Sequence, residues 1–260
     1  MNCHEIIGKL ESLSPAAFAE DWDNIGLLAG RQDKEVETVY IALDATDEVV
    51  EEAVRLGADM LLTHHPLIFK KLDRITTDDF TGRRICQLIK NDISYYAMHT
   101  NFDVMGMADA AADELSLKDR TVLNVTYEDD ISKEGCGRVG KLKKCMSVAE
   151  LAELVKARFH VPNVRVFGEL GDIAEVVAVM PGSGGGYIKD ALKAGADVMI
   201  TGDIDHHEGI DAVAQGMTII DAGHYGIEKL FISYMEEYIR RELPGLRICK
   251  AEIKEPFVVV

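Results

Sequence analysis

The sequence lacks a hydrophobic run long enough to cross a membrane, and it lacks an export signal at its start. No stretch of the 260 residues approaches the ~18 uninterrupted apolar residues that a transmembrane helix needs. The opening segment, MNCHEIIGKLESL, carries acidic residues and no apolar core, so it does not have the pattern of a signal peptide. We therefore expect a cytoplasmic globular protein that is not held in a membrane.

Cysteine and positive charge are also scarce. The five cysteines are dispersed without a metal-binding spacing, which is typical of reduced thiols in a cytoplasm rather than of a disulfide framework. The 28 Lys and Arg residues are outnumbered by 45 Asp and Glu residues, and the net charge is −17. This balance argues against non-specific binding to nucleic acid or to anionic membranes.

Common catalytic motifs are missing as well. The segment PGSGGGY at 181–187 lies between a predicted strand and a predicted helix, but it has neither the Lys-Ser/Thr of a P-loop nor a GxGxxG spacing. A phosphate-binding loop and a tight strand-to-helix turn explain this segment equally well. No Ser-His-Asp nucleophile elbow is present, and no cysteine lies in a motif that would activate it.

The segments that are present alternate between apolar, β-branched runs and helix-like runs. This alternation predicts an α/β protein with mostly parallel sheets and helices packed on them. We predict that a helix starts at Thr46 as N-cap and stops at Gly57. The remaining predictions are strands at 36–44, 58–63, 93–99, 174–180, 196–201, 217–223 and 246–260, and helices at 81–92, 147–159, 186–195 and 227–243.

An internal repeat divides the chain. AVRLGADMLLT (53–63) aligns without gaps onto ALKAGADVMIT (191–201), and the same offset of 138 pairs ETVYIA (37–42) with EVVAVM (175–180). We therefore predict two related α/β domains. The first comprises 1–120 plus 218–260, and the second comprises 121–217, opening with a turn-rich stretch.

Histidines and carboxylates gather where the predicted strands end. In an open parallel sheet, ligands bind beyond the carboxyl ends of the strands. Any one of these histidines, taken alone, is better explained as a loop or capping residue. Together they favour a metal site, because a solvated surface gives no reason for the clustering. Six of the eight histidines lie in four strand-end loops, at positions 64, 65, 99, 206, 207 and 224, along with Asp103, Asp203, Asp205, Glu208 and Glu228.

The adjacent pair His64-His65 bears on the number of metals. Neighbours on a strand point to opposite faces, so a chain that turns at Pro66 would send the two rings apart, each toward a different ion. Asp103 or Glu228 would then bridge two ions ~3.5–4 Å apart. Mixed nitrogen and oxygen ligands suit Zn, Fe, Mn, Co or Ni and argue against Mg or Ca.

The segment AEDWDNIGLLAG at 19–30 holds the single tryptophan. Asp23 and Asn24, with Gly26, have the pattern of a turn packed under Trp22. We interpret this segment as structural rather than catalytic.

The motifs WDNIGLLAG, THHPLIF, HTNFD, TGDIDHH and DAGHYGIE, in this order and over essentially the whole chain, resemble the GTP cyclohydrolase 1 type 2 homologue family in its compact form. The resemblance implies a toroidal homohexamer of chains with two related α/β domains, and metal pairs that face an internal cavity. The metal ligands that it implies are His64, His65, Asp103, His224 and Glu228.

The resemblance also assigns supporting residues. His99 is expected to support the ligands or transfer a proton, and His207 and the glycines at 182–186 are expected to border the cavity and meet substrate. Two positions depart from the family pattern, Ile227 where threonine is usual and Phe102 where leucine is common. Neither is a ligand, although Ile227 can alter a hydrogen bond near Glu228.

The leading hypothesis is a hydrolase with two divalent transition-metal ions per chain and a metal-bridging water or hydroxide as nucleophile. His99 and His207 are the candidate catalytic residues. The substrate is expected to be a small molecule, and the family's name implies a nucleotide, GTP. The alternatives are a non-catalytic metal-binding scaffold, and a phosphoesterase or amidase that uses the same metals.

Overall fold

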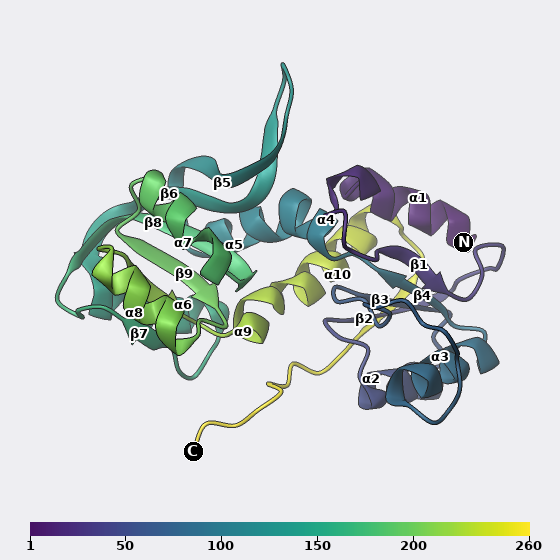
Figure 1. The fold of residues 1–260 in the computed structure, drawn as a ribbon. Helices are drawn as coiled ribbons and strands as arrows, with labels where there is room; N and C mark the ends of the chain where they lie inside the picture. The colour runs from purple at the N-terminus through teal and green to yellow at the C-terminus, as the bar shows by residue number, and fades with distance from the viewer. The chain divides into compact units, whose positions relative to one another are not determined.

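A computed structural model describes all 260 residues of the chain. The chain folds into two compact units (Figure 1). Unit 1 comprises Met1–Phe102 and Phe231–Lys254, and unit 2 comprises Asp103–Leu230 and Glu255–Val260. The predicted boundaries differ from these units, because 103–120, 218–230 and 255–260 lie in unit 2 rather than with the first domain. The reason is that residues 218–221 pair within the second sheet and residues 111 and 112 belong to its core.

Unit 1 is built on a five-stranded sheet with the strand order β1-β4-β3-β2-β11. All its strands are parallel except β1, which pairs antiparallel with β4. The helices α2 and α3 lie together on one face of this sheet, and α1 and α10 lie on the other (Figure 1). The elements are α1 (Cys3–Leu13), η1 (Ala16–Phe18), β1 (Gly26–Ala29), β2 (Thr38–Ala42), α2 (Asp47–Leu56), β3 (Met60–Thr63), α3 (Phe80–Lys90), β4 (Ser94–Ala97), α4 (Thr100–Phe102), α10 (Leu230–Glu242) and β11 (Arg247–Lys250).

Unit 2 contains a six-stranded sheet with the order β5-β6-β8-β9-β10-β7. Only the pairs β8–β9 and β9–β10 are parallel, and the other three pairs are antiparallel, so this sheet is mixed. The α/β class is confirmed, with the parallel strands at its centre. The elements are η2 (Asp103–Met107), α5 (Ala108–Glu114), β5 (Lys118–Glu128), β6 (Lys133–Ser147), α6 (Val148–Phe159), β7 (Arg165–Phe167), β8 (Ile173–Ser183), η3 (Gly185–Tyr187), α7 (Ile188–Lys193), β9 (Val198–Gly202), α8 (His206–Ala214), β10 (Thr218–Asp221) and α9 (His224–Glu228).

The helix α2 begins and ends at the predicted residues. The Thr46 hydroxyl accepts a hydrogen bond from the Val49 amide at 3.2 Å, which satisfies one of the amides that a helix start leaves open. Gly57 ends the helix with φ of 63°, a left-handed conformation that glycine adopts without a steric penalty.

The internal repeat extends to individual hydrogen bonds. One carboxylate oxygen of Asp59 accepts the amides of Glu37 and Thr38, each at 2.9 Å. At the offset of 138, Asp197 accepts the amides of Glu175 and Val176 at 2.9 and 2.8 Å. In both units an aspartate that precedes a parallel strand thus binds the start of the neighbouring strand.

The stretch predicted to be turn-rich is instead a long antiparallel hairpin, formed by β5 and β6. Its glycines are packing positions: a Cβ at Gly135 would overlap the Asn124 carbonyl, and one at Gly140 would lie 2.7 Å from the Lys118 carbonyl. Glycine therefore permits close approach of the two strands here. The true turn is a four-residue tip in which Asp129 accepts the amides of Ile131 and Ser132.

The predicted last strand is also shorter than expected. Only Arg247–Lys250 forms β11, because its single partner, β2, has five residues and pairs with it from Thr38 to Ile41. Residues 251–260 form no further strand.

The chain contains no disulfide bond and no helix suited to a membrane. All five cysteines are free thiols, with Cys3 and Cys136 buried and Cys145 exposed. No helix of this chain combines the length and the apolar character that crossing a membrane requires.

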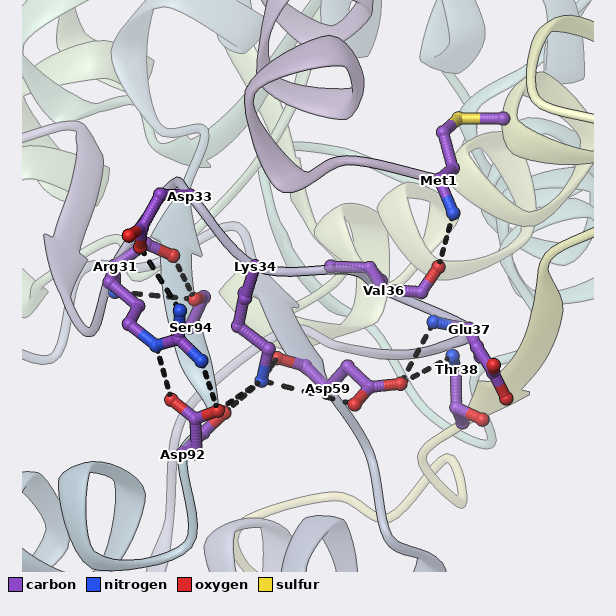
Figure 2. Close-up of polar contacts among 10 residues, drawn as sticks. All are labelled: Met1, Arg31, Asp33, Lys34, Val36, Glu37, Thr38, Asp59, Asp92 and Ser94. Carbon is purple, nitrogen blue, oxygen red and sulfur yellow. Dashed lines mark hydrogen bonds and ion pairs between the residues drawn. The ribbon is translucent and has the colours of Figure 1, made fainter.

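A network of charges closes the amino end of the sheet in unit 1 (Figure 2). The ammonium group of Lys34 donates to the carbonyls of Asp59 and Asp92, and it lies 3.8 and 3.5 Å from their carboxylates. Arg31 adds a bidentate contact to Asp92 at 3.0 Å. Lys34 is buried and its neighbours compensate its charge, so this network is structural. Asp59 and Asp92 of this network lie just before β3 and β4. The network is therefore at the opposite end of the sheet from the histidines that follow these strands.

The hairpin packing predicts the effect of one substitution. We expect Gly135→Ala to lower the free energy of unfolding by about 1–3 kcal/mol, because the added methyl group overlaps the facing strand. Gly171→Ala, whose added Cβ has nothing within 4 Å, is the matched control and should change stability by less than about 0.5 kcal/mol. Urea unfolding followed by circular dichroism measures both, and equal stabilities of the two variants would contradict this packing.

Candidate metal centre

Three histidines of unit 1 converge at the carboxyl end of its sheet. His64 and His65 follow β3 and His99 follows β4, and these two strands are parallel neighbours. The ends of parallel neighbours share one edge of a sheet, which brings these residues together. One ring nitrogen of each histidine lies within 4.8 Å of the others, and His64 is fully buried.

The adjacent histidines do not diverge as strand neighbours would. Their ring centroids lie 4.8 Å apart with an interplanar angle of 49°. Because β3 ends at Thr63, both histidines lie beyond the pleat that alternates side chains. That each ring serves a different ion stays a prediction.

Each ring of the adjacent pair is held through its Nδ1 atom. His64 Nδ1 lies 2.7 Å from the Met98 carbonyl oxygen, and His65 Nδ1 lies 2.8 Å from Asp44 Oδ1. A carbonyl or a carboxylate only accepts, so Nδ1 carries the proton in both rings. The nitrogen with the metal-binding lone pair is then Nε2, and this is the usual arrangement of a histidine that ligates a metal.

His99 is held in the same way by Asp23. His99 Nδ1 lies 2.8 Å from Asp23 Oδ1, and the other carboxylate oxygen accepts the amide and the hydroxyl of Thr100. Burial of Asp23 works against its charged form, but the hydrogen bonds from His99 and Thr100 outweigh this effect and lower the pKa of Asp23 to about 2. Asp23 therefore stays charged and fixes the orientation of the His99 ring.

The sequence motifs did not point to either carboxylate as a partner of a histidine. Asp23 was expected to belong to a structural turn, and Asp44 had no predicted role. A signal for Asp44 was available, because it follows the carboxyl end of β2 at the same edge of the sheet. Asp23 had no such signal, because it precedes an antiparallel edge strand.

A second group of predicted residues gathers within unit 2. His224 and Glu228 lie on the single turn of α9, with His224 Nε2 2.8 Å from Glu228 Oε2. Asp203, which follows β9, holds His224 Nδ1 at 3.0 Å. The Glu228 side chain is only 4% exposed. His224 is therefore oriented like His65 and His99 of unit 1, by a carboxylate on Nδ1.

Asp103 adds a further carboxylate to this group. It starts η2, a short π-helix of the kind often found at functional sites. Its ligand oxygen lies within 4.8 Å of that of Glu228. Two carboxylates this close repel each other unless a proton or a cation compensates them. The donor set of imidazole and carboxylate groups therefore fits a divalent transition metal.

The glycine-rich segment borders the Glu228 carboxylate. Gly182 has φ of 72°, and a Cβ at this position would overlap Glu228 Oε1. The chain then enters η3 and α7. This segment is therefore a strand-to-helix turn in which the backbone at Gly182 lies close to Glu228, a predicted metal ligand.

His207, by contrast, does not join the metal-binding groups. It lies exposed on the first turn of α8, next to the ring of His206 at a centroid distance of 5.2 Å. Asp205 caps this helix by accepting the Glu208 amide at 2.8 Å. The role of His207 in proton transfer stays a prediction.

Two α/β units with repeated topology, and with histidines and carboxylates at their strand ends, define a class of α/β proteins equipped to bind metal. The chain belongs to the Duf34/NIF3 (NGG1p interacting factor 3) family, whose model matches residues 1–256. This membership confirms the resemblance inferred from the sequence motifs.

Individual relatives agree with this assignment. The chain is 38% identical over 261 residues to a GTP cyclohydrolase 1 type 2 homolog of Clostridium perfringens, with 99% of each chain covered. It is similar to the crystal structure of a Bacillus cereus protein related to NIF3, with a TM-score of 0.91, 29% identity and coverage of 100% and 99%. It also resembles reduced HcgD from Methanocaldococcus jannaschii, with a TM-score of 0.83, 33% identity and coverage of 96% and 97%.

The role of Asp44 can be tested by its effect on metal affinity. We expect Asp44→Ala to weaken metal binding about 10–100-fold, because the His65 ring loses the acceptor that orients it. Asp33→Ala removes a carboxylate of the same unit whose side chain is 78% exposed, and it should leave affinity unchanged. Competition with a chromophoric chelator measures both variants, and equal affinities would refute the assignment of Asp44.

Proposed function

We propose that this protein is a metal-dependent hydrolase that holds two divalent transition-metal ions through His64, His65, Asp103, His224 and Glu228. The observation that carries the proposal is a hydrogen bond that all three histidine ligands make through Nδ1. Each predicted histidine ligand has its Nδ1 atom held by an oxygen acceptor, which directs Nε2 to a metal.

The donor atoms limit the identity of the metals. Three imidazole nitrogens with two carboxylates favour Zn, Fe, Mn, Co or Ni over Mg or Ca, which prefer oxygen ligands. When bound, a metal pair supplies Lewis acidity that activates water and polarises a substrate oxygen.

We assign proton transfer to His99, which Asp23 keeps in a fixed orientation. Because Asp23 holds the Nδ1 atom of His99, we assign the exchange of a proton to the Nε2 atom of that ring. His207 is proposed as a second proton-transfer group, from an exposed position on α8.

We propose a small-molecule substrate and take GTP as the first to test, because several relatives are named GTP cyclohydrolase 1 type 2 homolog. We also propose that the chain assembles as the toroidal homohexamer implied by the sequence motifs. Light scattering coupled to gel filtration would measure a mass close to six times 28.7 kDa, and a stable monomer would refute the assembly.

The hydrolase proposal predicts two metals per chain and turnover that depends on them. We expect His64→Ala and Glu228→Ala to lose metal and to reduce turnover by at least about 100-fold, because each removes a ligand. Metal content is measured by mass spectrometry, and turnover on GTP, phosphoesters and amides.

His4→Ala, which changes an exposed histidine on α1, is the control and should keep both properties. Turnover that persists in His64→Ala and Glu228→Ala would refute the catalytic role. Two metals with no turnover on any substrate would favour the non-catalytic scaffold.

A further inference from the structure

An exposed pair of aromatic rings lies beside the histidines of unit 1. Trp22 is 58% exposed and Phe69 is 53% exposed. Their ring centroids lie 5.6 Å apart with an interplanar angle of 47°. Both rings also contact the His99 ring, at centroid distances of 5.9 and 6.1 Å. The pair therefore lies directly next to the proposed proton-transfer residue.

Hydrogen bonds hold the two loops that carry these rings. The Asn24 side chain donates to the Ile68 carbonyl at 2.5 Å, which joins the loop that carries Trp22 to the loop that carries Phe69. Asp23, the residue between Trp22 and Asn24, is held by His99 and Thr100. The three residues of the WDN motif thus have separate tasks: a ring, an orienting carboxylate and a link between loops.

Single exposed apolar side chains are common on proteins and need no explanation. This pair differs because its two rings come from loops 47 residues apart and are linked by a side-chain hydrogen bond. The contact of both rings with His99 is a second feature that sets this pair apart from incidentally exposed side chains. A surface that is rigid before binding loses little entropy when a ligand docks.

We propose that Trp22 and Phe69 form the binding surface for a planar aromatic ring of the substrate, which stacks there with its reacting bond toward His99. Aromatic faces bind planar rings by offset or tilted stacking and tolerate differences in ring substituents. This inference rests on the proposed function, and it identifies the substrate class as a planar heteroaromatic compound.

The loop that follows Phe69 carries exposed charges of both signs. Lys70, Lys71 and Arg74 are positive, and Asp73, Asp78 and Asp79 are negative. Because these charges balance, the proposed surface recognises its ligand through the two rings. A nucleotide presents a planar base to such a surface and serves as the probe.

Trp22 is the only tryptophan of the chain, so its fluorescence reports on the pair without labelling. GMP, AMP and CMP are titrated into the full chain, with and without added Zn²⁺, and ribose 5-phosphate serves as the probe that lacks a base. The same titrations of N-acetyltryptophanamide correct for light absorbed by the bases. We expect saturable quenching by the nucleotides and none by ribose 5-phosphate.

Variants test the second ring. Phe69→Ala keeps Trp22 and should raise the Kd of the nucleotides at least about tenfold, because stacking on that ring is lost. Phe80→Ala removes a ring on α3 with a similar exposure, 58% against 53% for Phe69, and it should leave the Kd unchanged.

Three results would overturn the inference: no quenching by any nucleotide, equal quenching by ribose 5-phosphate, or an unchanged Kd in Phe69→Ala. These readouts do not depend on turnover. Metal binding and hydrolysis without quenching would reject the ring site and keep the proposed function. Quenching by nucleotides in a chain that binds no metal would keep the ring site and reject the function.

Discussion

The hydrogen bond to Nδ1 of each histidine is the interaction on which the candidate site depends. Neighbouring parallel strands bring His64, His65 and His99 to one edge, but an imidazole can still rotate and exchange its tautomer there. The acceptors Met98, Asp44 and Asp23 remove that freedom. They belong to three separate segments of unit 1, so orientation of the rings requires the folded sheet and the loops around it.

The repeat separates the parts of the fold that are structural from those that carry chemistry. At the amino ends of the parallel strands, Asp59 and Asp197 make the same hydrogen bonds in the two units. At the carboxyl end, the offset of 138 places Gly202 and Asp203 at the positions of His64 and His65. Asp203, at the position of His65, is not a histidine but accepts the hydrogen bond of one, His224. The scaffold is therefore duplicated, whereas the two strand ends supply different groups.

Periodicity predicted the parallel strands well because a buried parallel strand is a nearly continuous apolar run. It failed for the β5–β6 hairpin, where Gly135 and Gly140 had the pattern of turn residues but serve close packing. It also overextended the last strand, since the length of β11 is set by its partner β2. In both places a facing strand, which no local pattern contains, decided the outcome.

The sequence by itself determined which side chains gather at the strand ends. Parallel strands share one edge at their carboxyl ends, so chain order predicts that His64, His65 and His99 lie together. Only the tertiary structure decided which groups hold those rings and which surface lies beside them. Asp23 and His99 are 76 residues apart, and Trp22 meets Phe69 across two loops. Such contacts depend on the three-dimensional path of the loops, because no spacing in the sequence encodes them.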